Sequence, residues 1–315
     1  MSREQFEHAM QAVLTSHGVT AESHYVDVPL ISGKTHVLTA GVGAPLVMVN
    51  GAGTPAAMFA PLMSRLDGYR IYGIDLPGYG LTDPRPDLFE DHRANAVAFL
   101  RQTLDALALD RPVILGNSLG SLWTLWLALD APDRLAASIH VGCPAIILGT
   151  SAPLPMRLMS TWLGPMLMKL RPPSPRQVRS LSKMVHEHPL GREIVDLLVA
   201  TERLPGGAQT FLGTMRSMLR LRGAQPGMGL TEQQLSAVQQ PSLIVWGEDE
   251  VFGSPEVGRR MAAAMPNAEL HIVPGAHAPW LKHSEQIAPL VRRFTAGLAP
   301  HPSGASSDRG EERSM

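Results

Sequence analysis

The chain has 315 residues, 44% of them hydrophobic and 17% charged, which suits one large α/β domain or a core with an inserted subdomain. Its net charge of −1 suggests neither nucleic acid nor an anionic membrane as a partner. The single cysteine, Cys143, excludes an intramolecular disulfide, and no apolar stretch approaches the roughly 18 residues of a membrane span. Since residues 1–11 also lack the apolar segment of a signal peptide, we expect a cytoplasmic protein.

The first half of the sequence alternates between patterns typical of helices and of strands. Residues 3–17 have apolar side chains at helical spacing and predict an N-terminal accessory helix within residues 1–22. Strands are predicted at residues 25–29, 35–39, 45–49, 70–74, 111–115 and 136–141, the first two forming a hairpin. Helices are predicted at residues 56–66, 91–108 and 121–129. This alternation predicts the α/β class, with a mostly parallel sheet and helices on both faces.

The alternation stops between residues 145 and 240, where no convincing strand occurs and prolines interrupt the helical pieces. It resumes with strands at residues 242–246 and 269–273 and helices at 255–265 and 284–298. Because both ends of the interruption return to the same sheet, we expect residues 145–240 to form a helical cap over the ligand-binding edge of that sheet. Residues 23–144 and 241–298 then form the two parts of the core, and residues 299–315 are expected to be a disordered tail.

A G-x-S-x-G sequence, Gly116-Asn117-Ser118-Leu119-Gly120, lies between the predicted strand 111–115 and the predicted helix 121–129. A serine in this setting occupies a sharp strand-to-helix turn, the nucleophile elbow, in which side chains at the two glycine positions would collide. Ser118 is therefore the candidate nucleophile. The oxyanion created by its attack needs two backbone donors. The candidates are the amide of Leu119 and an amide of Ala52 or Gly53, in the turn after strand 45–49.

A serine nucleophile needs a base and an acid, which in elbow-type hydrolases follow it in the order acid, then histidine. His277 is the candidate base, because it lies in a loop directly after the last predicted strand. Asp249 and Glu250, which follow strand 242–246, compete for the role of acid. We favour Asp249 because aspartate is commoner in this role and has the shorter side chain, but counting from the flanking residues supports either carboxylate.

The predicted cap supplies candidate substrate contacts. It holds eight of the sixteen methionines, and flexible thioethers suit an irregular apolar binding site. The candidate contacts are Trp162, Met166, Phe211 and Met215. His186 and His188 form an H-x-H pair with only Glu187 nearby, which is weak as a metal site. Cys143 lacks a local partner base and is expected to be a buried, inert thiol, so we expect neither a cofactor nor a bound metal.

Five stretches together resemble the α/β-hydrolase fold superfamily, in particular its capped, cofactor-free esterase and C–C-bond hydrolase branch. The stretches are residues 47–53, 74–80, 116–120, 244–249 and 275–280. Three positions depart from the usual pattern of the family. Asn50-Gly51 stands where the family usually has His-Gly, Ala276 replaces the glycine before the base, and the acid loop is one residue shorter. Since the dehalogenases and epoxide hydrolases of the family carry aspartate at the elbow, Ser118 argues against both activities.

The resemblance implies a serine hydrolase that cleaves an apolar ester, thioester or activated C–C bond through an acyl-enzyme. Its substrate would be a small apolar molecule. Two alternatives remain: a ligand-sensing or regulatory binding protein on the same fold, and a cofactor-free haloperoxidase-like enzyme, although such enzymes usually lack a large cap. The family supports many activities, so the fold alone does not choose among them.

Overall fold

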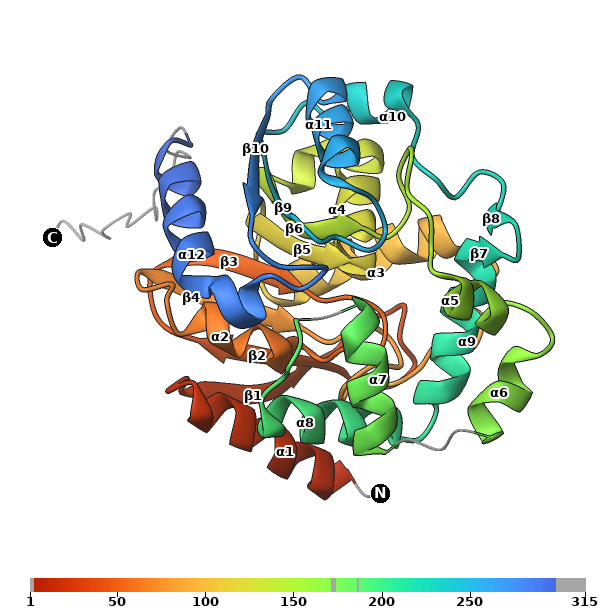
Figure 1. The fold of residues 1–315 in the computed structure, drawn as a ribbon. Helices are drawn as coiled ribbons and strands as arrows, with labels where there is room; N and C mark the ends of the chain where they lie inside the picture. Colours follow the sequence, from red (N-terminus) through yellow and green to blue (C-terminus); the bar gives the residue numbers. More distant parts are fainter. Residues whose placement is uncertain (1–2, 171–173, 186, 299–315) are drawn as a thin grey trace, which may run out of the picture.

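The computed structural model of the chain describes residues 3–170, 174–185 and 187–298. Within these residues an eight-stranded sheet forms the core, in the order β1-β2-β4-β3-β5-β6-β9-β10 (Figure 1). The strands are β1 (Ala21–Val26), β2 (Thr35–Ala40), β3 (Ala44–Val49), β4 (Tyr69–Ile74), β5 (Val113–Ser118), β6 (Ala137–Pro144), β9 (Ser242–Gly247) and β10 (Ala268–Val273). The tail predicted at residues 299–315 lies outside the described residues.

The sheet is mostly parallel, as the sequence predicts. The pairs β4–β3, β3–β5, β5–β6, β6–β9 and β9–β10 are parallel. Strands β1 and β2 form the predicted hairpin, and β2 is antiparallel to β4. The central strands are apolar because both of their faces are covered, and β6 and β9 are buried along their whole length. Strand β1 begins at Ala21, before the predicted start at residue 25, and stays partly exposed at the edge of the sheet.

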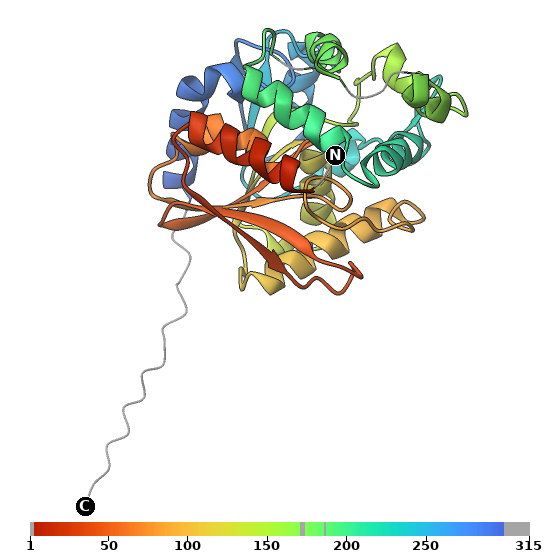
Figure 2. The ribbon, with the colours of Figure 1, turned by 90° about the horizontal axis from the view of Figure 1, so that it is seen from below.

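Helices cover both faces of the sheet (Figures 1 and 2). One apolar layer includes side chains of α1 (Arg3–Ser16), α2 (Ala60–Met63) and α12 (Trp280–Ala296). The other includes side chains of α3 (His92–Ala106), α4 (Leu119–Asp130) and α11 (Pro255–Ala264). A short 3-10 turn, η2 (Pro132–Arg134), follows α4.

Two predicted helices differ from the observed ones. The helix expected at residues 56–66 is divided into the 3-10 turn η1 (Ala56–Phe59) and α2, and Pro61, which has no amide hydrogen, lies at the start of α2. The last helix begins at Trp280 and has a non-helical residue, His283, inside it. The apolar periodicity of the sequence detected only the part of α12 that follows this kink.

The segment between β6 and β9 is mainly helical. Its helices are α5 (Leu154–Met159), α6 (Gly164–Leu170), α7 (Pro175–Val185), α8 (Arg192–Glu202), α9 (Gly207–Met218) and α10 (Glu232–Ser236). The expectation of no strand here is wrong in one place, because β7 (Leu219–Arg220) and β8 (Gly223–Ala224) form a short antiparallel ribbon. The tight turn between them requires a φ of 133° at Gly223, which glycine adopts without steric cost. We call residues 145–240 the cap. Helix α8 packs against α1, as both views show (Figures 1 and 2).

None of the helices in the described part of the chain combines the length and the apolar character needed to cross a bilayer.

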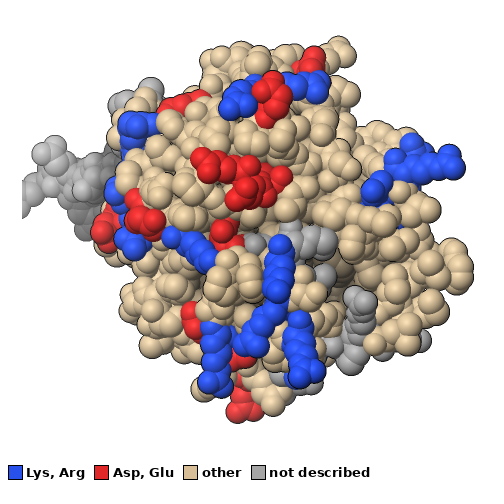
Figure 3. Space-filling view, viewed as in Figure 1, with Lys and Arg blue, Asp and Glu red and all other residues tan. Residues whose placement is uncertain are grey.

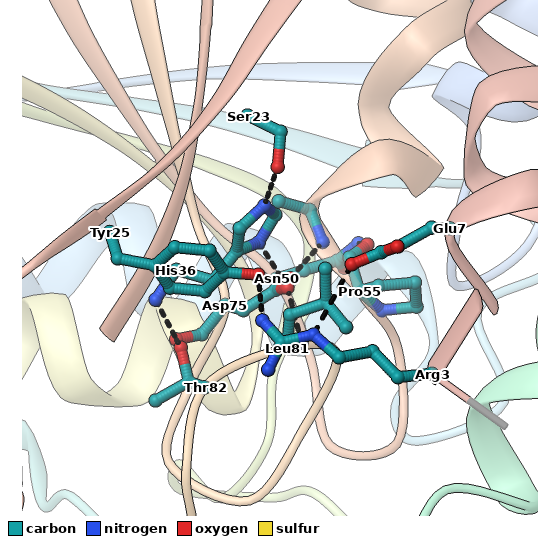
Figure 4. Close-up of polar contacts among 11 residues, drawn as sticks. Arg3, Glu7, Ser23, Tyr25, His36, Asn50, Pro55, Asp75, Leu81 and Thr82 are labelled. Atoms are coloured by element: carbon teal, nitrogen blue, oxygen red, sulfur yellow. Dashed lines mark hydrogen bonds and ion pairs between the residues drawn. The ribbon is translucent and has the colours of Figure 1, made fainter. Parts of the chain in front are cut away.

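A buried polar network fixes the loops at the start of the sheet (Figure 4). Nδ1 of His36 on β2 lies 2.7 Å from Oδ2 of Asp75, and its Nε2 lies 2.8 Å from Oγ of Ser23 on β1. The Asp75 carboxylate also accepts the amide hydrogens of Ala56, at 2.7 Å, and of Leu81, at 2.9 Å. Ala56 begins η1, directly after the turn that follows β3, so this network fixes the C-terminal end of that turn.

Candidate active site

Ser118 lies at the junction of β5 and α4 in a backbone conformation that few non-glycine residues adopt, with φ 50° and ψ −116°. Such a conformation costs on the order of 1–3 kcal/mol and persists only where the surrounding structure enforces it. Close packing explains both glycines of the motif. A Cβ atom on Gly116 would lie 2.6 Å from the Ser121 amide nitrogen, and one on Gly120 would lie 2.1 Å from the Val49 carbonyl oxygen. The turn therefore has the geometry expected of a nucleophile elbow.

His277 and Glu250 form a buried pair. Nδ1 of His277 lies 3.0 Å from Oε1 and 2.9 Å from Oε2 of Glu250, and the two residues are 4% and 6% exposed. The carboxylate also accepts the amide hydrogens of Cys143, at 2.8 Å, and Phe252, at 3.2 Å. Burial alone would raise the pKa of Glu250, but the charge and hydrogen bond of His277 and the two amides outweigh it and hold the pKa below its ordinary value.

Glu250, and not the favoured Asp249, is the carboxylate that meets His277. The Asp249 side chain is exposed, while its backbone amide donates to the Gly275 carbonyl at 2.9 Å. The Glu250 amide donates back to the Gly247 carbonyl at 3.3 Å, which closes a tight turn. This turn directs the side chain of residue 249 to solvent and that of residue 250 to His277, and the longer glutamate side chain spans the distance.

The elbow and the histidine loop are joined through the side chain of Asn117. Its Nδ2 donates to the Val141 carbonyl at 2.8 Å and to the His277 carbonyl at 3.0 Å. In the sheet, Ser118 pairs with Pro144, next to the Cys143 amide that binds Glu250. Ser118 at the end of β5, Glu250 after β9 and His277 after β10 thus lie at the same edge of the sheet, linked through Asn117 and through Cys143 of β6. The sequence analysis missed Asn117, although a polar residue between an apolar strand and an apolar helix was a usable signal.

The turn after β3 lies against Ser118. A Cβ atom on Gly51 would be 3.0 Å from Cβ and 3.6 Å from Oγ of Ser118. Asn50 holds this turn, because its Oδ1 accepts the Gly51 amide at 2.8 Å and its Nδ2 donates to the Pro55 carbonyl at 3.0 Å. The amides of Ala52 and Gly53 donate to no other described residue, and Leu119 begins α4, where amides have no partner within the helix. The candidate oxyanion donors are therefore free to bind a ligand.

The four cap residues that the sequence suggested as substrate contacts occupy different environments. Phe211 on α9 reaches the turn, since a Cβ atom on Gly53 would lie 3.4 Å from its ring. Met215, one helical turn further, is buried in the apolar layer. Trp162 and Met166 are 80% and 48% exposed, so neither side chain is enclosed in a binding site.

One further cap residue reaches the candidate site. The carboxylate of Glu187, between α7 and α8, accepts the amide hydrogen of Ala276, directly before His277. Nearby, Nζ of Lys282 donates to the His188 carbonyl at 2.7 Å. Sequence reasoning considered Glu187 only as a neighbour of the H-x-H pair, of which His186 lies outside the described residues.

Cys143 is fully buried, and its Sγ donates to the Pro144 carbonyl at 3.0 Å. Burial and the nearby Glu250 carboxylate raise the pKa of its thiol, so Cys143 is unsuited to act as a nucleophile. The described residues contain no group of three or more His, Cys, Asp and Glu side chains arranged to hold a metal ion.

The sheet order, the elbow and the buried histidine–carboxylate pair together define a class of protein. Residues 44–284 match the family described as the alpha/beta hydrolase fold, and the chain belongs to this family. This confirms the resemblance and the fold class inferred from the sequence.

Several relatives and solved structures resemble the chain over most of its length. It is 27% identical to a 2-hydroxy-6-oxononadienedioate/2-hydroxy-6-oxononatrienedioate hydrolase of Pseudomonas sp. over 87% of this chain and 96% of that protein. It is also 27% identical to a pimeloyl-[acyl-carrier protein] methyl ester esterase of Shewanella sp. over 84% and 95% of the two chains. The crystal structure of carboxylesterase CesB from Bacillus subtilis superposes with a TM-score of 0.76 at 22% identity, covering 94% and 98% of the two chains.

Proposed function

We propose that the chain is a serine hydrolase that cleaves a small apolar ester, thioester or activated C–C bond through an acyl-enzyme. Ser118 is the nucleophile, His277 the general base and Glu250 the acid that orients it. One observation carries the proposal: a strained serine elbow and a buried His277–Glu250 pair lie at the same edge of the sheet and are joined through Asn117. The named relatives include a 2-hydroxy-6-oxononadienedioate/2-hydroxy-6-oxononatrienedioate hydrolase and a methyl ester esterase, which supports a hydrolytic reaction.

The first half-reaction is the attack of Ser118 Oγ on the carbonyl carbon of the substrate. With Nδ1 bound to Glu250, the proton of neutral His277 lies on Nδ1, and Nε2 is free to take the proton of the serine hydroxyl. The negative charge moves to the carbonyl oxygen, where the amides of Leu119 and of Ala52 or Gly53 stabilise it. The imidazolium then donates its proton to the leaving group, and the acyl-enzyme remains on Ser118.

The second half-reaction uses water in place of the serine hydroxyl. His277 takes a proton from the water, hydroxide attacks the acyl carbon, and the serine oxygen leaves with the proton held by the imidazolium. Glu250 stays ionised throughout, because its pKa is held below the ordinary value, and its charge stabilises the imidazolium in both steps.

An apolar acyl or leaving group suits the surroundings of the turn. Phe211 covers Gly53 from the cap, and Met215 continues the apolar surface of α9 beneath it. The same observations are compatible with a ligand-sensing protein, which would bind such a molecule without turnover. A hydrolase would transfer the acyl group of the ligand to Ser118, whereas a ligand-sensing protein would not.

The test compares wild type, Ser118→Ala and Ser23→Ala. Ser23 is a matched control, since its hydroxyl contacts His36, a buried histidine that is paired with the Asp75 carboxylate. We expect wild type and Ser23→Ala to react with a fluorophosphonate probe and to hydrolyse a short-chain p-nitrophenyl ester. Ser118→Ala should not be labelled and should lose roughly 10⁴- to 10⁶-fold in kcat.

A panel of apolar esters, thioesters and vinylogous diketones then assigns the bond that is cleaved. Retention of a tenth of the wild-type activity by Ser118→Ala would remove it as the nucleophile. Binding of panel members without turnover, at equal affinity in wild type and Ser118→Ala, would favour the sensor.

A further inference from the structure

The cap is basic although the chain as a whole is slightly acidic. Residues 145–240 contain 11 of the 27 Lys and Arg residues but only 5 of the 28 Asp and Glu residues, which gives the cap a charge of +6 and the remainder −7. Between residues 145 and 186 there are six Lys and Arg residues and no Asp or Glu. The net charge of −1 hides this separation, which creates a positive potential over one side of the molecule.

Helix α7 presents a row of basic side chains to solvent. Arg176, Arg179 and Lys183 are exposed and, at spacings of three and four residues, share one face of the helix, while Val178 and Ser182 are buried. None of these three cations forms an ion pair within the described part of the chain. Figure 3 shows blue side chains where Figure 1 draws α7, with red ones beside them toward α8, whereas the place of α6 is mostly tan.

Large apolar side chains are exposed in the part of the cap that precedes α7 in the chain. Five of the seven exposed large hydrophobic residues in the described part of the chain belong to the cap, including Trp162 at 80%, Met166 at 48% and Leu170 at 70%. Met166 and Leu170 lie four residues apart in α6 and therefore share one side of that helix, and Trp162 lies in the turn directly before it. Helix α7 begins at Pro175, shortly after Leu170, so the apolar row and the basic row follow each other in the chain.

We propose that this surface docks on a lipid membrane that carries anionic headgroups. We call it the cap face and define it by Trp162, Met166, Leu170, Arg176, Arg179 and Lys183. Exposed Trp, Leu and Met side chains suit the boundary between headgroups and acyl chains. The Arg and Lys side chains of α7, the helix that follows α6 in the chain, form no ion pair within the described residues and are available to negative headgroups. The apolar and basic rows together match a lipid interface better than either row would alone.

The cap face is one helix away from the candidate active site. Helix α6 packs on α9, because a Cβ atom on Gly164 would lie 2.9 Å from the side chain of Leu212. Helix α9 in turn carries Phe211 against Gly53. Docking would therefore place this part of the cap against the lipid bilayer, in which apolar molecules accumulate. The proposal goes beyond the proposed reaction and does not depend on it.

The direct test is co-sedimentation of the full chain with vesicles. We expect binding to vesicles of phosphatidylglycerol and phosphatidylcholine in equal parts, little binding to pure phosphatidylcholine, and loss of binding as NaCl rises from 20 to about 500 mM. Fluorescence gives a second readout, because Trp123, Trp126, Trp246 and Trp280 are fully buried. A blue shift and protection from acrylamide on adding vesicles would therefore report on Trp162, and Trp162→Ser should abolish both changes.

A triple variant, Arg176→Gln/Arg179→Gln/Lys183→Gln, tests the basic row. Each basic residue near an anionic surface strengthens binding about fivefold, so the partition coefficient should fall on the order of 100-fold at low salt. The matched control is Lys34→Gln/Arg101→Gln/Arg259→Gln, which removes three exposed cations of the core and should stay within about twofold of wild type. Both triple variants should unfold at the same temperature as wild type, which shows that each is folded whether or not the protein hydrolyses an ester.

Three results would overturn the proposal. The first is no association of wild type with anionic vesicles at low salt. The second is equal loss of binding in the cap and core triple variants, which would indicate a general charge effect. The third is that the protein does not bind vesicles but binds an acidic carrier protein in a salt-sensitive way, or buries Trp162 as its own concentration rises. Either result would assign the cap face to a protein partner and not to lipid. If vesicles bind but no ester is hydrolysed, the proposed reaction fails and the docking proposal stands.

Discussion

Nδ1 of His277 lies 2.9 Å from Oε2 of Glu250, and the same oxygen accepts the Cys143 amide at 2.8 Å. Cys143 is in β6, beside the elbow strand, whereas Glu250 follows β9 and His277 follows β10. One carboxylate therefore connects three consecutive strand ends of the sheet. Because it is 6% exposed and bound by two amides and an imidazole, its orientation is fixed before any substrate arrives.

Replacing Glu250 by glutamine should impair turnover far more than replacing Asp249 by asparagine. The amide can present its NH2 group to His277, which favours the wrong tautomer, and it cannot stabilise the imidazolium. We expect Glu250→Gln to lower kcat by roughly 10³- to 10⁴-fold with little change in KM, and Asp249→Asn to remain within about twofold of wild type. The measurement is the kcat of each variant with a p-nitrophenyl ester at pH 7.5.

A large drop in Asp249→Asn with normal rates in Glu250→Gln would reverse this assignment. Thermal unfolding of both variants is the control, because a lower kcat is informative only if the protein is folded under the assay conditions.

The fold was predictable because its signals are local. Apolar runs alternate with amphipathic stretches, so strands β3 to β6, β9 and β10 and the helices between them in the core follow from periodicity and from the turn residues. The elbow was also predictable, because steric exclusion at Gly116 and Gly120 leaves a short contiguous motif. His277 could be proposed from its position after the last strand alone.

The choice of acid was not predictable, because it depends on which way two adjacent residues face in a tight turn. The hydrogen bond between the Asp249 amide and Gly275, far along the chain, decides this orientation. The cap was equally hard to interpret. Apolar side chains at helical spacing are compatible with a substrate site, a core or an exposed surface, and Phe211, Met215 and Trp162 turn out to occupy three different environments.

Glu187 should act as a positioning residue for the loop that carries His277. Its carboxylate accepts the Ala276 amide and is 8% exposed, so its removal would leave a buried amide without a partner. We expect Glu187→Ala to lower kcat about tenfold and to destabilise the fold by about 1–3 kcal/mol. Glu187→Gln keeps an acceptor oxygen and should recover most of both losses. Steady-state kinetics and urea unfolding of the two variants test this.

Asp196→Ala is the matched control for Glu187, because Asp196 is an exposed carboxylate of the same region whose partner, Arg192, is 89% exposed. Its kinetics should match those of wild type. If Glu187→Ala lost stability but kept the wild-type kcat, the residue would be structural and would not position the base.

The Ser23–His36–Asp75 network should matter for stability and not for catalysis. Asp75 is 1% exposed and accepts hydrogen bonds from His36, Ala56 and Leu81. Asp75→Ala would leave these donors unpaired, so we expect a loss of about 3–5 kcal/mol in the free energy of unfolding. Ser23 is exposed, and Ser23→Ala should cost less than about 1 kcal/mol. Urea unfolding measures both, and equal losses in the two variants would contradict the proposed role of Asp75.

Acid sensitivity should depend on His92, which joins the core to the cap. Its Nε2 accepts the indole hydrogen of Trp123 at 3.2 Å, and its Nδ1 lies 3.0 Å from Oγ of Ser217 on α9. Burial lowers the pKa of His92 from 6.5 to about 4. Between these values the unfolded chain binds a proton that the folded protein does not, so the free energy of unfolding must fall as the pH falls from 6.5 and level off below about 4.

Replacing His92 by glutamine should therefore flatten the pH dependence of stability between pH 6.5 and 4. Glutamine does not titrate, and it can still accept from Trp123 and donate to Ser217. A pKa shift of this size corresponds to about 3 kcal/mol, which wild type should lose over the interval and His92→Gln should retain. Some dependence will remain in the variant, because burial also lowers the pKa of His140, to about 3. Urea unfolding at pH 7 and pH 4.5 gives the comparison, with the exposed His8→Gln as the control. Equal acid-induced losses in wild type and His92→Gln would show that protonation of His92 does not limit stability at low pH.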